Sequence, residues 1–142
     1  RIQSVWLFLA ALLNAGVFYF DLYTTHTQVA GVDTVQHIRV SNSMPLILMA
    51  LVMVALPLIS IFMYKNRKQQ RGVAAISLVA AFSFISVVTM HVAEYKKSSP
   101  DASGLSFSVG GVLPYFTIVL LGLALRGISK DDKLVKSLDR LR

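Results

Sequence analysis

The stretch Lys65-Asn66-Arg67-Lys68-Gln69-Gln70-Arg71 decides how the chain is organised. It holds four cationic residues and no acidic one. A long apolar run precedes it, from Met44 to Tyr64, and a second follows it, from Val73 to Val92. A basic segment between two such runs is typical of a cytoplasmic loop that joins two membrane helices. The sequence therefore predicts an integral membrane protein.

The composition supports the same class. Hydrophobic residues make up 55% of the 142 residues and charged residues only 15%, whereas soluble domains average about 25% charged residues. The chain has no cysteine, which excludes disulfides, thiol–disulfide catalysis and thiolate metal sites. The net charge of +7 lies in short segments beside apolar runs. We therefore favour contact with anionic lipid over nucleic-acid binding.

Four apolar segments predict four membrane helices in one domain covering residues 1–142, at about 5–23, 44–64, 73–92 and 109–125. Each has about the 20 residues that are needed to cross a hydrocarbon core about 30 Å thick. In the second helix we expect a cap at Asn42 or Ser43, Pro45 in the first turn and a kink at Pro57. The predicted fold class is an all-α four-helix transmembrane bundle.

The polar segments between these helices predict a small β cap on the outer face. Residues 21–43 are rich in threonine and valine, which favours a hairpin with a turn near Gly31. Leu105, Phe107 and Val109 alternate with serines, which predicts a short strand that pairs with the first loop.

The last segment, 129–142, predicts a separate amphipathic basic helix on the cytoplasmic membrane surface. Ser129 and Asp132 have the spacing of a capping box. Its apolar stripe comprises Leu134, Val135, Leu138 and Leu141. Two readings stay open: a docking helix for anionic lipid or a cytoplasmic partner, and a chain end that only fixes the topology.

The distribution of cations predicts the orientation. Eleven of the fourteen Lys and Arg residues lie in the N-terminal segment, the 65–71 segment and the tail. This excess predicts that both termini are cytoplasmic. The candidate residues for contact with lipid or a partner are Lys65, Arg67, Lys68, Arg71, Lys133, Lys136, Arg140 and Arg142.

The three histidines are weak candidates for a cofactor site. His91 lies near the outer end of the third predicted helix, and His26 and His37 lie in the first outer loop. Imidazole suits both haem and metal, but membrane haems usually need histidines that face each other from two helices. We favour an interfacial His91 that bonds to loop backbone, and we expect no cofactor and no metal.

No charged residue lies in the central part of any predicted helix, which disfavours an ion or proton pathway. Asp21 and Glu94 are expected to be exposed at outer helix ends. Asn14 is expected to bond to serines of the third helix as packing, with substrate binding as the alternative. The chain has no nucleotide or metalloprotease motif. We expect no enzymatic activity and no catalytic residue.

The two ends of the chain carry a family resemblance. Arg1-Ile2-Gln3-Ser4-Val5 with Leu9-Ala10-Ala11-Leu12-Leu13-Asn14, and the segments 123–128 and 130–142, resemble an uncharacterised four-helix inner-membrane family of Bacteroidota, a domain of unknown function. The resemblance covers essentially the whole chain. It implies the fold, the topology and a bacterial inner membrane, and it implies no catalytic site.

These observations predict a non-enzymatic structural or accessory subunit of a larger inner-membrane assembly, with other membrane subunits as possible partners. Two alternatives stay open. One is a small haem- or quinone-linked redox protein that uses His91 with an outer-loop histidine. The other is a transporter of lipid or small molecules that works through the Pro57 kink.

Overall fold

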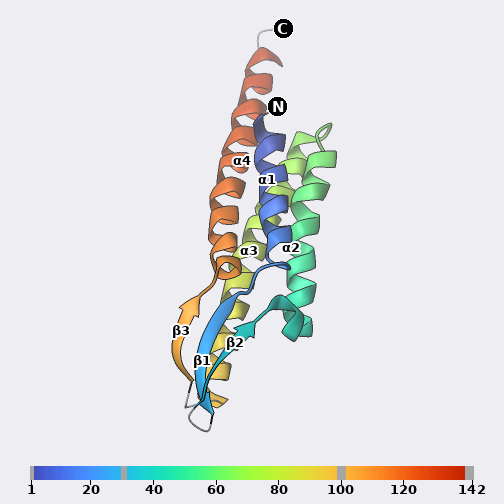
Figure 1. Cartoon of the computed structure of the whole chain (residues 1–142). Helices are drawn as coiled ribbons and strands as arrows, with labels where there is room; N and C mark the ends of the chain where they lie inside the picture. The colour runs from blue at the N-terminus through green and yellow to red at the C-terminus, as the bar shows by residue number, and fades with distance from the viewer. Residues whose placement is uncertain (1, 30–31, 99–101, 140–142) are drawn as a thin grey trace.

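The computed structural model describes residues 2–29, 32–98 and 102–139, and these form four α-helices and one small sheet (Figure 1). The helices are α1 (Ile2–Gly16), α2 (Met44–Phe62), α3 (Arg67–Ser98) and α4 (Val109–Asp139), with a 3-10 turn η1 (Val40–Asn42) before α2. The strands are β1 (Tyr23–Val29), β2 (Val32–Ile38) and β3 (Ala102–Phe107).

The four helices run side by side, and the sheet lies at one end of them (Figure 1). Helix α1 contacts α2 and α4, and α3 contacts the same two helices. Between them lies a core of small and large apolar side chains that includes Leu7, Ala10, Ala50, Met53, Ala81, Phe84, Leu121 and Ala124. Small residues at these contacts let the helix backbones approach closely. We call the end with the sheet the sheet end and the other the basic end.

The sheet confirms the predicted hairpin and the predicted third strand. Strand β1 is central and pairs antiparallel with both β2 and β3. Tyr23 lies opposite Ile38 on one side and Phe107 on the other. The predicted turn at Gly31 lies outside the described residues. The expected combination of four helices with a small β cap is confirmed.

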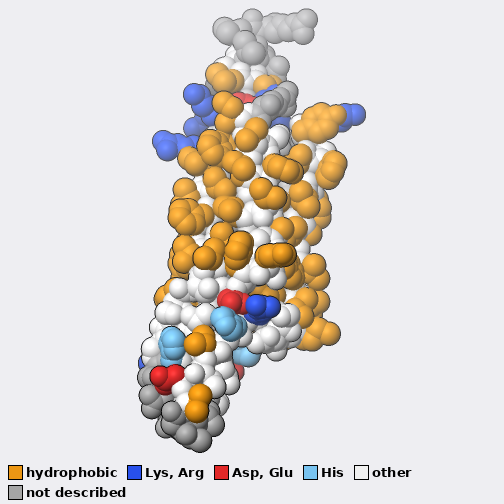
Figure 2. All heavy atoms as spheres, in the orientation of Figure 1, with side chains coloured by type: hydrophobic (Ala, Val, Ile, Leu, Met, Phe, Trp, Pro, Cys, Tyr) orange, Lys and Arg blue, Asp and Glu red, His pale blue; other side chains and the backbone are white. Residues whose placement is uncertain are grey.

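Large apolar side chains cover the outward faces of the helices and form a belt around their middle (Figure 2). The belt includes Phe8, Leu12, Leu51, Val52, Val79, Phe82, Phe116 and Val119. Within the described residues, three segments are long and apolar enough to cross a membrane: α2, α3 and residues 109–135 of α4. Helix α1 is apolar but shorter.

The predicted boundaries of α1 and α3 are wrong, and α3 also ends at Ser98 and not near Val92. Helix α1 ends at Gly16 and not near Tyr23, because the backbone N–H groups of Tyr19 and Phe20 both donate to the Gly16 carbonyl and turn the chain toward the sheet. Helix α3 begins at Arg67 and not at residue 73, so most of the 65–71 segment is helical. Arginine, lysine and glutamine are good helix formers, and hydropathy alone could not place the helix start.

The predicted separate tail helix is also wrong. Helix α4 continues through residues 126–129 without a break and extends past the first turn of α1 (Figure 1). Ser129 therefore lies inside a helix, and its predicted capping box with Asp132 does not form. Gly127 is a packing position, because a Cβ atom there would lie 2.9 Å from Gln3 Cγ. The predicted cap of α2 is partly correct: Ser43 is the N-cap residue, but its side chain makes no capping bond.

Candidate functional site

The sheet end contains an ion-paired carboxylate. Asp21, in the connection from α1 to β1, accepts hydrogen bonds from His37 Nδ1 at 2.7 Å and from Arg39 Nε at 2.5 Å. Its side chain is only 17% exposed, so the expectation of simple surface exposure is wrong for Asp21, whereas Glu94 is exposed as expected. The bond from Arg39, and then that from His37, hold the pKa of Asp21 below its ordinary value despite partial burial.

A cavity of about 270 Å³ lies beside this ion pair, between the end of β2, the start of α2 and the last turns of α3. Its lining comprises Gln36, His37, Ile38, Arg39, Asn42, Leu46, His91 and Tyr95. We call it the interfacial cavity, because its lining joins the sheet end to the first turn of α2 and the last turns of α3, and Figure 2 shows the apolar belt ending next to the sheet. The Tyr95 hydroxyl donates to Gln36 Oε1 and joins α3 to β2.

The structure therefore brings two of the three histidines, His37 and His91, to one cavity. His26 is exposed on β1, beside Gly104, and does not line it. Within the described residues His91 makes no hydrogen bond, so the predicted bond to loop backbone is not found. The described part of the chain holds no group of three or more His, Cys, Asp or Glu side chains placed to bind a metal ion.

The bundle interior contains a buried polar link between three helices. Asn14 Nδ2 donates to the Met53 carbonyl oxygen at 2.7 Å, and the Thr117 hydroxyl donates to Asn14 Oδ1 at 2.8 Å. Asn14 is 2% exposed and Thr117 is fully buried. The prediction that Asn14 bonds to serines of the third helix is wrong. Ser77, Ser83 and Ser86 donate to carbonyls one turn earlier in α3 itself.

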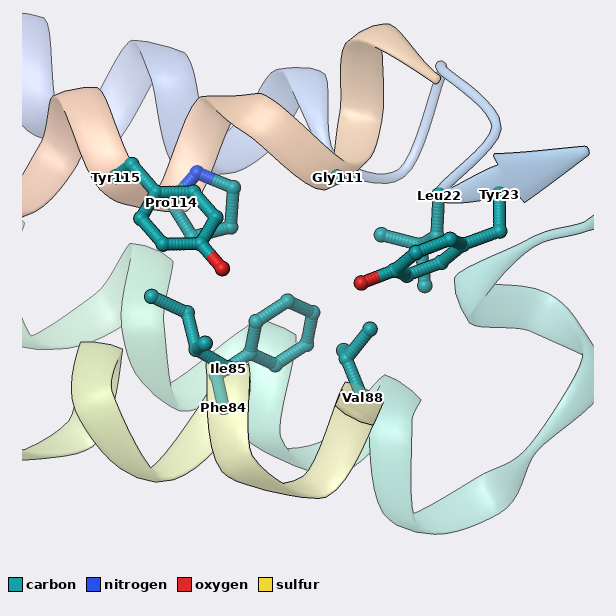
Figure 3. A pocket seen from close by; sticks show the side chains of 8 residues that line it. All are labelled: Leu22, Tyr23, Phe84, Ile85, Val88, Gly111, Pro114 and Tyr115. Atoms are coloured by element: carbon teal, nitrogen blue, oxygen red, sulfur yellow. The ribbon is translucent and has the colours of Figure 1, made fainter. Parts of the chain in front are cut away.

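A second small cavity, of about 10 Å³, opens between α3 and α4 next to the sheet (Figure 3). The hydroxyl groups of Tyr23 and Tyr115 point toward each other across it, beside Phe84 and Val88 (Figure 3). Burial, and then the nearby Tyr115, raise the pKa of Tyr23, so its hydroxyl stays protonated. A space of this size has room for about one water molecule between two hydroxyl groups.

At the basic end, Asp131 connects α4 to two other segments. Its carboxylate accepts a hydrogen bond from Gln3 Nε2 of α1, and its backbone carbonyl accepts one from Arg67 of α3 at 3.1 Å. The predicted proximity of the 65–71 segment and the tail is therefore found. An open groove of about 450 Å³ lies beside this junction between α1 and α4, lined in part by Trp6 and Lys130.

The candidate cations are only partly described. Lys65, Lys68 and Arg71 are exposed at the basic end, as is Lys133 on the projecting part of α4. Arg67 is half-buried because it bonds to Asp131. The side chain of Lys136 and all of Arg140 and Arg142 lie outside what the structure describes. The basic surface is defined here by Lys65, Lys68, Arg71, Lys130 and Lys133.

A family model described as a domain of unknown function, DUF4293, matches residues 1–141. The chain belongs to the DUF4293 family. Neither the comparison with curated proteins nor that with solved structures gives a match. Membership of DUF4293 confirms the expected resemblance to an uncharacterised family. It assigns no activity to any residue, so the polar sites of this DUF4293 chain are interpreted from their own geometry.

Proposed function

We propose that this chain is a four-helix protein of the bacterial inner membrane. It acts as a non-enzymatic accessory subunit of a larger assembly. The apolar belt supports membrane insertion, because such exposed apolar surface is unfavourable in water and three segments have the length and hydropathy of membrane spans. Helix α1 has 15 residues, about 22 Å at 1.5 Å per residue, and the turns after Gly16 extend its path toward the sheet end.

The proposed orientation has the basic end in the cytoplasm. The described cations of the basic surface all lie there, together with the start of α1 and the end of α4 (Figures 1 and 2). Arg39, Lys96 and Lys97 are the described Lys and Arg residues of the sheet end. This asymmetry supports an orientation with both termini inside.

One observation supports the accessory role above the others. The buried polar side chains that the structure describes inside the belt either join two helices or bond within one helix. Asn14 joins α1 to α2, Thr117 joins α4 to Asn14, and Ser77 bonds within α3. A transporter or an intramembrane enzyme needs polar groups at this depth that are available to a substrate. Asn14, the group proposed for the transporter alternative, already uses its amide N–H and its carbonyl oxygen.

Co-purification tests the accessory role. The native protein, extracted in a mild detergent with a small affinity tag, is expected to elute with other membrane subunits in stoichiometric amounts. A control extraction in a harsh detergent should release it as a single subunit without partners. A chain that elutes alone under mild conditions, at every expression level, would contradict the proposal.

A haem- or quinone-linked redox protein is the second candidate, because His37 and His91 line the same cavity. One feature weighs against bis-histidine haem ligation: the cationic Arg39 lines the same space. The bond from His37 Nδ1 to Asp21 does not, because a histidine that binds iron through Nε2 commonly donates its other N–H to a carboxylate. The visible absorption spectrum of the purified protein tests whether it binds haem. A Soret band that disappears in His91→Gln would favour the haem form of this candidate. The absence of any such band would remove it.

A further inference from the structure

The interfacial cavity combines charged, polar and apolar side chains in an arrangement suited to an amphiphile. Arg39, His37, His91 and Asn42 line one part of it, and Ile38 and Leu46 provide apolar surface. Its volume of about 270 Å³ is large enough for a headgroup. It lies at the level where the apolar belt ends, which is where the headgroup of a membrane lipid would be found.

Arg39 has donors left over for a ligand. Its Nε donates to Asp21 Oδ1, which orients the guanidinium group. Within the described residues its two terminal amines make no hydrogen bond. A guanidinium group whose Nε side is held by a carboxylate can still present these amines to a phosphate or carboxylate oxygen. Arg39 is therefore both positioned and available.

His91 is the second available group. It is half-buried, makes no hydrogen bond to a described residue, and lines the interfacial cavity. It also lines an adjoining cavity of about 270 Å³ between α2 and α3, with Ser43, Met90 and Glu94. A half-buried imidazole without a protein partner is expected to form a hydrogen bond with water or with a ligand that enters the cavity. Its ring N–H can donate a hydrogen bond to an anion.

We propose that the interfacial cavity binds an oxyanion, a phosphate or carboxylate group, that is attached to an apolar chain. The oxyanion contacts Arg39 and His91, and the chain leaves along Ile38 and Leu46 toward the apolar belt. Asp21 does not repel this ligand strongly, because its charge is paired with Arg39 and His37. Glu94 faces only the adjoining cavity, and the Tyr95 hydroxyl is bonded to Gln36. This inference goes beyond the accessory role and depends on membrane placement only for the apolar chain.

Calorimetric titration of the full-length protein in dodecyl maltoside tests the site, with decyl phosphate, inorganic phosphate and decanol as probes. Decyl phosphate is expected to bind saturably, and decanol is not. His91→Gln and Arg39→Gln should each weaken the binding at least tenfold. The matched controls are His26→Gln, an exposed histidine outside the cavity, and Lys97→Gln, an exposed cation at the same end. Both should bind as the wild type does.

The melting temperature of each variant separates a loss of binding from a fold defect. The fold of His91→Gln is not expected to suffer, because the His91 side chain makes no hydrogen bond to a described residue. Arg39→Gln removes the ion pair with Asp21, so its melting temperature is measured beside its affinity.

The titrations answer two separate questions: whether the site exists, and whether its ligand is a free anion or a lipid. If inorganic phosphate competes with decyl phosphate, the site binds a free anion. If it does not, the apolar chain is required and a lipid is the source. Both outcomes support the site. Binding of decyl phosphate that does not saturate, or that is equal in the wild type, His91→Gln and His26→Gln, would overturn it. Failure here leaves the co-purification result, and so the accessory role, untouched.

Discussion

The side-chain amide of Asn14 donates to the Met53 carbonyl oxygen, which is the carbonyl that Pro57 leaves without its helical donor. In an α-helix the N–H of residue 57 would bond to the carbonyl of residue 53, and proline has no N–H. A neighbouring helix thus supplies the missing donor, and Thr117 holds the amide in place from α4. The position of Pro57 in α2 and the packing of α1 are therefore coupled.

This coupling can be measured with a double-mutant cycle. Asn14→Ala should destabilise the folded bundle by about 1–2 kcal/mol, because it leaves the Met53 carbonyl without a donor and leaves the Thr117 hydroxyl only its bond to the Leu113 carbonyl within α4. Pro57→Ala restores a backbone donor to Met53, so the same Asn14→Ala change should cost less in that background. Unfolding of the four proteins in detergent gives the coupling energy. Additive effects would show that Asn14 does not compensate for Pro57.

The start of α4 should not tolerate side chains larger than hydrogen. A Cβ atom at Gly110 would lie 2.7 Å from the carbonyl oxygens of Phe20 and Asp21, and one at Gly111 would lie 2.5 Å from the Leu22 carbonyl oxygen. Gly110→Ala and Gly111→Ala should each lower stability by about 1–3 kcal/mol. Gly122→Ala is the matched control, since a Cβ atom there meets nothing within 4 Å. Thermal unfolding compares the three variants, and equal effects would contradict the close approach.

The ion pair at Asp21 predicts a dependence of stability on pH. The pKa of Asp21 is lowered in the fold below its ordinary value of 3.8. Its stabilising contribution is therefore fully present above about pH 4 and is lost as the pH falls through the lower folded value. Asp21→Asn should lower the melting temperature at pH 7 and leave a smaller further loss below pH 4. Asp33→Asn, on the exposed face of β2, serves as control. If the melting temperatures of the wild type and Asp21→Asn fell in parallel as the pH was lowered, the ion pair would not be the source of the pH dependence.

The absence of cysteine makes the proposed orientation directly testable. Lys97→Cys places a single thiol at the sheet end, and Lys68→Cys places one at the basic end. In intact cells a maleimide that cannot cross the inner membrane should label Lys97→Cys. It should label Lys68→Cys only after the membrane is permeabilised. The reverse pattern would place the sheet inside, and labelling of both would argue against a membrane barrier between them.

The basic surface is expected to retain anionic lipid. Each Lys or Arg near an anionic membrane surface contributes about 1 kcal/mol. Replacing Lys65, Lys68 and Arg71 by glutamine should therefore reduce retention of phosphatidylglycerol at least about tenfold at low salt. Lys96→Gln with Lys97→Gln, at the sheet end, is the control. Native mass spectrometry of protein from mixed-lipid nanodiscs provides the measurement. Retention that is insensitive to salt and to these changes would contradict the proposal.

Sequence patterns located the elements better than their ends. Hydropathy reports which residues suit an apolar environment, so it found the four apolar helices. It does not report where backbone hydrogen bonding stops. Helix α3 therefore starts at Arg67, among polar residues that are good helix formers. The fourth helix was predicted to end at residue 125, whereas α4 continues past Gly127, where the lack of a side chain makes room for Gln3.

The sequence predicted only some of the residues that line the interfacial cavity. His91 and an outer-loop histidine were proposed as neighbours, and His37 rather than His26 lines the cavity with His91. On β1 and β2 adjacent residues point to opposite faces of the sheet, so the choice between the two histidines depends on strand register. No sequence pattern predicted that Arg39 and Asn42 would line the cavity.

The sequence by itself determined the class of the protein: four apolar helices, a three-stranded cap and a basic end. These follow from local composition and periodicity, which act within a few residues. Only the tertiary structure decided that Asn14 serves the carbonyl freed by Pro57, that Asp21 pairs with Arg39 and His37, and that the basic segment and α4 meet at Asp131. Each of these is a contact between groups distant along the chain. Its partner is set by how the helices and the sheet pack, and not by neighbouring residues.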